Sequence, residues 1–290
     1  MDVTGYLTIL YRGPLSSCNY ACPYCPFAKR RESRAEQEAD RLALARFVGW
    51  VARRTAPTSV FFTPWGEALV RHWYREALVE LSRLEHVHRV AIQTNLHAPV
   101  DALRHADRQK LALWCTYHPG EVPRARFLRQ CAKLDELGLD YSVGVVGLRE
   151  HFDEIEALRE ALPASRYLWI NAYKRSPGYY DVEDIARLAR IDPHFSTNTI
   201  RHPSRGRRCR TGESVVSVDG SGDMRRCHFV DEVIGNIYAD EVTDALRPRP
   251  CPNATCGCHI GYVHMNDLGL YDVYAGGLLA RIPASVSRLS

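Results

Sequence analysis

The chain has 290 residues, of which 46% are hydrophobic and 25% charged, and its formal net charge at pH 7 is +4. This balance is ordinary for a soluble globular protein and by itself requires neither a nucleic-acid nor a membrane partner. No apolar run is long enough to span a membrane, and the first residues lack the basic region and apolar core of a secretory signal. We therefore expect a cytoplasmic protein, in which ten cysteines indicate metal binding more often than disulfides.

Short apolar runs rich in strand formers recur along the first two thirds of the chain. They predict six strands, at residues 6–11, 59–63, 88–94, 111–117, 141–146 and 167–172. Apolar residues at helical spacing predict a helix after each strand. The first has an apolar face at Leu44, Phe47, Val48 and Val51. The next helices end near residue 84, start near residue 100, include residues 127–137, and span residues 153–162 and 182–191. Six strand–helix units favour a parallel sheet covered by helices, curled into a partial barrel, with the site at the C-terminal ends of the strands.

Three cysteines within eight residues follow the first strand, with the spacing C-x3-C-x2-C. They are Cys18, Cys22 and Cys25, and the next cysteine is Cys115. Thiolates on one short loop converge, and soft sulfur ligands select zinc, copper(I) or an iron–sulfur cluster. Zinc usually requires a fourth ligand or a water, whereas a four-iron cubane held by three thiolates leaves one iron open. The open-iron interpretation is favoured, and a small zinc site or buried packing is the alternative.

This spacing, with Tyr24 just before the last cysteine, resembles the signature of the radical S-adenosylmethionine (radical SAM) superfamily. The resemblance implies a (β/α)6 partial TIM-type barrel and a [4Fe-4S] cluster whose open iron is chelated by SAM. It also implies that an electron from the cluster splits SAM into methionine and a 5′-deoxyadenosyl radical, which abstracts a hydrogen atom from a substrate. By the same resemblance Tyr24 lies near the adenine.

Further matches to the family follow the second, third and fifth strands. Trp65-Gly66-Glu67 stands where the family has a Gly-Gly-Glu-type motif for the SAM amino group, and the first glycine is replaced. Thr94-Asn95 is similar to a pair that contacts the SAM ribose or carboxylate, and Val145 matches an aliphatic residue that packs on adenine. The alternatives are a helix N-terminus favoured by Glu67, a helix cap or Asx turn at Asn95, and a barrel-core role for Val145.

Three further residues of the barrel half have a structural interpretation. Cys115 and Cys131 occupy apolar faces and are expected to be buried. His118 ends the fourth strand, and we interpret it as a turn histidine, with contact to SAM or substrate as the alternative.

Composition changes after about residue 192. Residues 214–218 and 224–229 predict a β-hairpin around Asp219-Gly220-Ser221-Gly222. Five cysteines accompany it, one of them within the second predicted strand: Cys209, Cys227, Cys251, Cys256 and Cys258. We divide the chain into a barrel domain at 1–195 and a cysteine-rich domain at 196–290.

Over residues 205–260 this layout resembles the twitch/SPASM-type extension of radical SAM enzymes. The resemblance implies one auxiliary [4Fe-4S] cluster, although C-x4-C-x-C replaces the usual C-x2-C in the second half. A structural zinc site held by four cysteines is the alternative. Five arginines at 201–210 are either a solvated face, or groups that neutralise the cluster or bind an anionic substrate. The tail after Cys258 shows no clear helix, and we expect it to fold back over the barrel mouth or the cluster.

Taken together, these patterns predict a radical SAM enzyme that modifies a small molecule or a peptide, by oxidation or another radical reaction. They imply two [4Fe-4S] clusters, SAM, and a flavodoxin- or ferredoxin-type reductant, with no nucleic-acid partner. A non-catalytic metal-binding or electron-transfer protein with zinc or iron–sulfur sites is the alternative.

Overall fold

The computed structural model describes residues 6–28 and 30–287. In this part of the chain a nine-stranded sheet has the order β10-β9-β8-β1-β2-β3-β4-β5-β6. Its strands are β1 (Leu7–Arg12), β2 (Thr58–Phe62), β3 (Val87–Thr94), β4 (Leu111–Tyr117), β5 (Asp140–Val146), β6 (Leu168–Asn171), β8 (Val215–Asp219), β9 (Asp223–Arg225) and β10 (Val233–Asn236). Strands β1 to β6 and β8 run parallel, and β9 and β10 are antiparallel additions at one edge. The predicted partial barrel is therefore confirmed.

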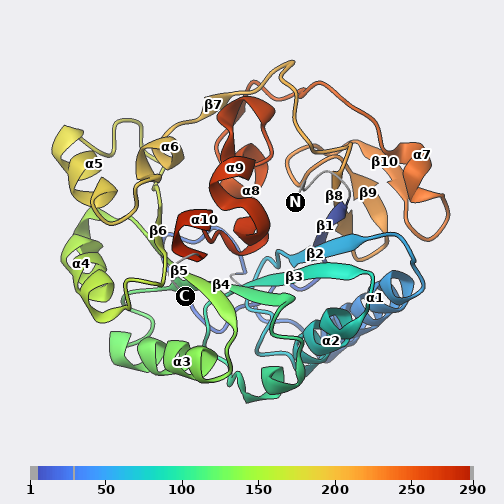
Figure 1. Cartoon of the computed structure of the whole chain (residues 1–290), viewed down its shortest axis with the longest axis horizontal. Coiled ribbons are helices and arrows are strands. Elements are labelled where there is room, and N and C mark those ends of the chain that lie inside the picture. Colours follow the sequence, from blue (N-terminus) through green and yellow to red (C-terminus); the bar gives the residue numbers. More distant parts are fainter. Residues whose placement is uncertain (1–5, 29, 288–290) are drawn as a thin grey trace.

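Helices alternate with the strands and surround the sheet (Figure 1). They are α1 (Arg34–Ala52), α2 (His72–Arg83), α3 (Arg124–Glu136), α4 (Phe152–Ala161), α5 (Val182–Ala189), α6 (Phe195–Thr199) and α7 (Val242–Ala245). The helix expected from about residue 100 is wrong, because only the 3-10 turn η2 (Asp101–His105) forms there. Another 3-10 turn, η3 (Arg149–His151), precedes α4. Within the described residues, no helix is both long enough and apolar enough to cross a membrane.

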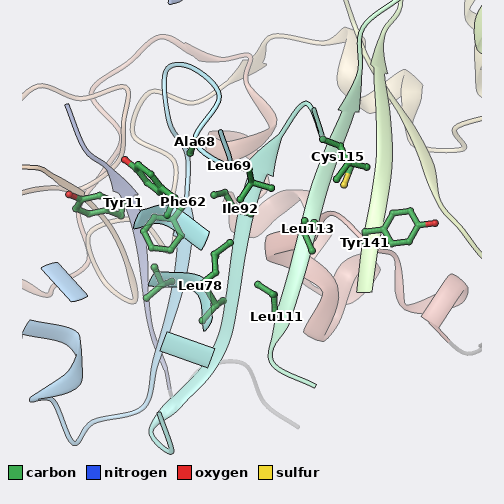
Figure 2. Close-up of a cluster of buried hydrophobic side chains, with 14 of the residues drawn as sticks. Tyr11, Phe62, Ala68, Leu69, Leu78, Ile92, Leu111, Leu113, Cys115 and Tyr141 are labelled. Carbon is green, nitrogen blue, oxygen red and sulfur yellow. The ribbon is translucent and has the colours of Figure 1, made fainter. Parts of the chain in front are cut away.

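The outward face of the sheet packs against the helices in one large apolar core. Figure 2 shows part of it, where Phe62, Ile92 and Leu113 extend from neighbouring strands toward the surrounding side chains. Cys115 is fully buried in this core, and Cys131 of α3 is nearly so. Both cysteines thus have the structural role that the sequence predicts.

The inward face of the sheet is covered by the C-terminal tail. Its helical segments lie at the centre of the ring in Figure 1: α8 (His259–Tyr262), η4 (Asn266–Leu268), α9 (Leu270–Tyr274), η5 (Ala275–Ala280) and α10 (Ala284–Ser287). They pack on inward residues of the strands, among them Phe61, Trp114 and Trp169. The expectation that the tail lacks helices is wrong, because short turns too brief to show a periodicity form where they bury these apolar rings.

The hairpin expected in the C-terminal third forms, but its second strand is shorter than predicted. Strand β9 ends at Arg225, so Cys227 lies beyond the strand rather than within it. Strand β8 pairs in parallel with β1, in register from Thr8 with Val215 to Arg12 with Asp219. The hairpin therefore continues the barrel sheet beyond β1.

Candidate functional site

The cysteine loop after β1 is tied to the elements around it by buried carboxylates. Glu32 accepts the backbone N–H of Ser16 at 2.5 Å and the hydroxyl of Ser17 at 2.8 Å, and it also forms an ion pair with Arg71 at 3.2 Å. Asp40 of α1 accepts the backbone N–H of Leu15 at 3.1 Å. These bonds fix the backbone that leads into Cys18, since buried charge-assisted hydrogen bonds are strong.

Gly66 lies against the same stretch of loop. A β-carbon on Gly66 would be 1.7 Å from the backbone oxygen of Ser17 and 3.2 Å from the nitrogen of Cys18. The next residue, Glu67, donates its backbone N–H to that Ser17 oxygen at 3.2 Å. Only glycine permits this approach, so the β2–α2 turn and the cysteine loop are packed backbone to backbone.

The side chain of Glu67 joins the ends of two strands. Its carboxylate accepts the hydroxyl of Thr94 at 2.7 Å and the backbone N–H groups of Asn95 at 2.5 Å and Leu69 at 3.0 Å. Burial raises the pKa of Glu67 to about 7, although these hydrogen bonds oppose the shift. Asn95 extends the network, because its Nδ2 donates to Asn19 in the cysteine loop at 3.0 Å. The pairs predicted from the second and third strands therefore meet around one carboxylate.

The three loop cysteines line a cavity of about 370 Å³ at the C-terminal ends of the strands. Gly66, Glu67, Thr94 and Asn95 line the same cavity. Burial raises the pKa of Cys18 and raises the pKa of Cys22 to about 11. In this environment the thiolate forms are disfavoured until a positive group balances them. Three cysteine side chains thus line one cavity together with the Glu67 network.

Two of the predicted cofactor residues do not line this cavity. The hydroxyl of Tyr24 is 2.8 Å from Nδ1 of His118, which is itself 3.4 Å from the sulfur of Cys22. Val145 is fully buried in the outer core, whereas its neighbour Val146 lines the cavity. Successive residues of a strand face opposite sides of the sheet. Val145 therefore faces the outer core, and the next residue, Val146, faces the cavity.

His118 contacts side chains of the cysteine loop and is more than a turn residue. It lines the cavity of the cysteine loop, and burial lowers its pKa to about 4, so the imidazole is neutral at pH 7. Other lining residues that the sequence did not single out come from the strands and from the C-terminal third: Arg12, Trp114, Trp169, Asn171, His228 and His259. Asn171 could have been predicted, because it lies at the C-terminal end of β6, where barrel sites form. The residues beyond 200 are brought to the cavity by tertiary contacts that the sequence does not show.

The five cysteines of the C-terminal third line a second cavity, of about 470 Å³. They come from separate segments, and the short pair β7 (His202–Pro203) and β11 (Thr255–Cys256) holds two of these segments together. Burial raises the pKa of Cys227 to about 11, and burial together with the other four cysteines raises the pKa of Cys256 to about 12. Cys256 also touches the backbone of α8, where a β-carbon on Gly261 would be 2.7 Å from its sulfur.

The two cavities share part of their lining. Phe27, Phe229 and Cys258 line both of them. Cys258 is exposed, whereas Cys227 is buried. Cys258 therefore lies at the junction of the two cavities.

Within residues 6–28 and 30–287, no group of three or more His, Cys, Asp or Glu side chains is arranged so that it could hold a metal ion.

No family model matches the sequence, and no curated protein matches it. The fold resembles solved structures of anSMEcpe, one with bound AdoMet and Cp18Cys peptide and one with bound AdoMet. Both have a TM-score of 0.53 and 14% identity; the alignments cover 82% of this chain and 81% and 82% of theirs. BtrN in complex with AdoMet and 2-DOIA aligns with a TM-score of 0.37 at 17% identity, over 83% of this chain and 81% of its own, which is too low to carry an argument.

The expected α/β architecture is thus shared, over most of both chains, with a protein that was solved with bound AdoMet. At 14% identity this likeness concerns the fold and not the substrate or the reaction. The chain therefore has the fold of anSMEcpe, a partial barrel of parallel strands, to which its C-terminal third adds antiparallel strands.

Proposed function

We propose that the protein is a radical SAM enzyme, which cleaves SAM reductively and abstracts a hydrogen atom from a substrate. The observation that carries this proposal is the position of the Cys18, Cys22 and Cys25 loop. It lies at the C-terminal ends of parallel strands, in one cavity with the Glu67 network. The active sites of β/α barrels lie at this end. The likeness to anSMEcpe, solved with bound AdoMet, supports the same assignment.

The residues of the chain would hold and orient the cofactors. Three thiolates from a loop that is fixed by Glu32 fit three irons of a [4Fe-4S] cluster, which supplies the electron for cleavage of SAM. Glu67 uses its carboxylate to fix the turn at Thr94 and Asn95, and so keeps the backbone acceptors beside the cysteine loop in place for the SAM amino group. The aromatic and aliphatic lining of the cavity keeps water from a reactive intermediate.

We assign the auxiliary site to Cys209, Cys227, Cys251 and Cys256. Besides burial, the charges of Cys209 and Cys251 raise the pKa of Cys227, whereas Cys258 acts, with the other three, on the pKa of Cys256. Cys258 is also the one exposed thiol among the five, and it lines the first cavity as well. Four thiolates complete the ligation of one cubane, which leaves Cys258 as the spare cysteine at the junction of the cavities. The variant Cys258→Ser is expected to keep the auxiliary metal, whereas Cys256→Ser loses it.

The substrate would be a small molecule or a peptide that reaches the shared edge of the two cavities. One solved structure of anSMEcpe holds a peptide, which supports the peptide class. Among the described residues that line the first cavity there is a single carboxylate, Glu67, and there are several hydrogen-bond donors, such as Arg12 and Asn171. A flavodoxin- or ferredoxin-type protein would supply the electron.

The test is metal and SAM binding by anaerobically reconstituted protein. We expect the wild type to bind SAM in calorimetry, and the Cys18→Ala/Cys22→Ala/Cys25→Ala variant to bind none and to lose about four irons. The variant Cys131→Ala is the matched control, because it removes a buried thiol outside both cavities. Equal SAM binding by the triple variant and the wild type would overturn the proposal, and metal binding without any SAM binding would favour the non-catalytic alternative.

A further inference from the structure

Arg226 connects three of the segments that carry the C-terminal cysteines. It directly precedes Cys227 in sequence, and its side chain lines their cavity while remaining only 2% exposed. Its Nη1 donates to the backbone oxygen of Pro250, the neighbour of Cys251, at 2.5 Å. Its Nη2 donates to the hydroxyl of Thr211 at 3.2 Å, and that hydroxyl donates to the sulfur of Cys209 at 3.2 Å.

No carboxylate balances this buried cation. Among the described residues, none of the ion pairs includes Arg226, and its Nε has no hydrogen-bond partner. The described residues that line the cavity include no aspartate or glutamate, while they do include Lys174, Arg175, Arg201 and Arg207 in addition to Arg226. A buried charge is costly unless it is paired, so the cavity is built around an anionic occupant.

We propose that Arg226 is the buried counter-charge of the thiolate-bound metal group in this cavity, and that it makes the reduction of that group easier. This inference rests on the auxiliary site proposed above. Four thiolates give a cubane net negative charge, and reduction adds one more. A fixed positive charge held beside the sulfurs stabilises the reduced state more than the oxidised state, and in a buried site this effect is only weakly screened.

The charge and the geometry of Arg226 can be separated by two substitutions. Arg226→Lys keeps the positive charge and loses the forked hydrogen bonds, whereas Arg226→Gln keeps a hydrogen-bond donor and loses the charge. Arg207→Gln is the matched control, because Arg207 lines the same cavity but is exposed and pairs with Asp267 at 3.2 Å. Its charge is screened by solvent, so its removal is expected to change little.

The experiment is an EPR-monitored redox titration of the reconstituted full-length chain that carries Cys18→Ala/Cys22→Ala/Cys25→Ala, so that only the auxiliary cluster gives a signal. We expect Arg226→Gln to disfavour reduction at least tenfold, about 59 mV for a one-electron couple. We expect Arg226→Lys and Arg207→Gln to stay close to the parent. Equal potentials in Arg226→Gln and the parent, or equal shifts in Arg226→Gln and Arg226→Lys, would overturn the role of the charge.

Metal content separates this outcome from failure of the auxiliary site itself. If Arg226→Gln takes up no metal, retention by Arg226→Lys supports the proposal, and loss in both variants overturns it. If the parent holds zinc, the iron–sulfur assignment and the redox role of Arg226 both fall, because zinc has no redox chemistry. If the parent holds no metal, both proposals fall.

Discussion

Replacement of Gly66 by alanine tests whether the cysteine loop and the β2–α2 turn depend on their backbone contact. The new β-carbon would be 1.7 Å from the oxygen and 2.4 Å from the carbon of Ser17. Contacts of a β-carbon below 3.0 Å are essentially never seen, so one of the two segments must move by at least 1.3 Å, the difference between 3.0 Å and 1.7 Å. Because the obstacle is backbone, no side-chain rotation relieves it.

The expected cost follows from this displacement. Overpacking in a well-packed site costs about 1–3 kcal/mol, and we expect Gly66→Ala to lower the free energy of unfolding by about 3 kcal/mol, at the upper end of that range. The Cys18 nitrogen lies 3.2 Å from the same point, so the cysteine loop moves too. A misplacement of about 1 Å costs roughly 100-fold in the rate of a positioned reaction, and we expect a loss of this order in SAM cleavage.

The assays are urea unfolding of the apo protein and, after reconstitution, SAM calorimetry together with the rate of 5′-deoxyadenosine formation. The control is Gly49→Ala in α1, where the nearest atom is 3.5 Å away and belongs to a flexible arginine side chain. There we expect a gain of about 0.5–1 kcal/mol, because alanine is the better helix former. If Gly66→Ala unfolds and binds SAM as the wild type does, the close backbone contact is not part of the site.

Further predictions concern a buried carboxylate, the outer core and a helix cap. Burial raises the pKa of Glu67 from 4.5 to about 7, so the folded apo protein keeps a proton that the unfolded chain releases, and its stabilisation is full below pH 4.5 and lost as the pH rises through 7. Urea titrations at both ends of this window should therefore differ by about 3 kcal/mol more in the wild type than in Glu67→Gln, and parallel pH profiles would contradict the assignment. Leu113→Ala empties part of the core shown in Figure 2 and should cost about 3 kcal/mol in chemical denaturation; a cost below about 1 kcal/mol would mean that the site is loosely packed. Ser33→Ala removes the hydroxyl that accepts the Glu36 N–H, which is one half of the capping box of α1. It should lower the free energy of unfolding by about 1 kcal/mol, whereas no change would show that α1 is held by tertiary packing alone.

The barrel strands could be predicted from the sequence because each is a compact apolar run that ends in polar, glycine or proline residues. Strand β4 was predicted with its observed bounds, Leu111–Tyr117. Phe61 lies in the inner core and Phe62 in the outer core. Because both faces of the sheet are buried, consecutive strand residues are apolar instead of alternating with polar ones. Helix α1 starts at Arg34, earlier than its apolar face begins, because its first turn is fixed by a polar cap.

The parts of the site that were missed depend on contacts distant in sequence. His228 and Cys258 line the cavity of the first cysteine loop although both lie more than 200 residues from it. No local pattern shows the pairing of β8 with β1 that joins the C-terminal third to the barrel. The valine at the cavity is Val146 rather than the Val145 that the family pattern indicated. The sequence of the tail predicts no helix, because helical turns of four or five residues are too short to show a periodicity.

The most direct test of the central claim is the formation of 5′-deoxyadenosine from SAM by the reconstituted protein under reducing, anaerobic conditions. The account predicts that the wild type forms it, that Cys131→Ala forms it at a similar rate, and that the Cys18→Ala/Cys22→Ala/Cys25→Ala variant forms none. If the reconstituted wild type holds its iron and yields no 5′-deoxyadenosine, or if the triple variant yields as much as the wild type, the assignment of this cysteine loop to radical SAM chemistry is contradicted.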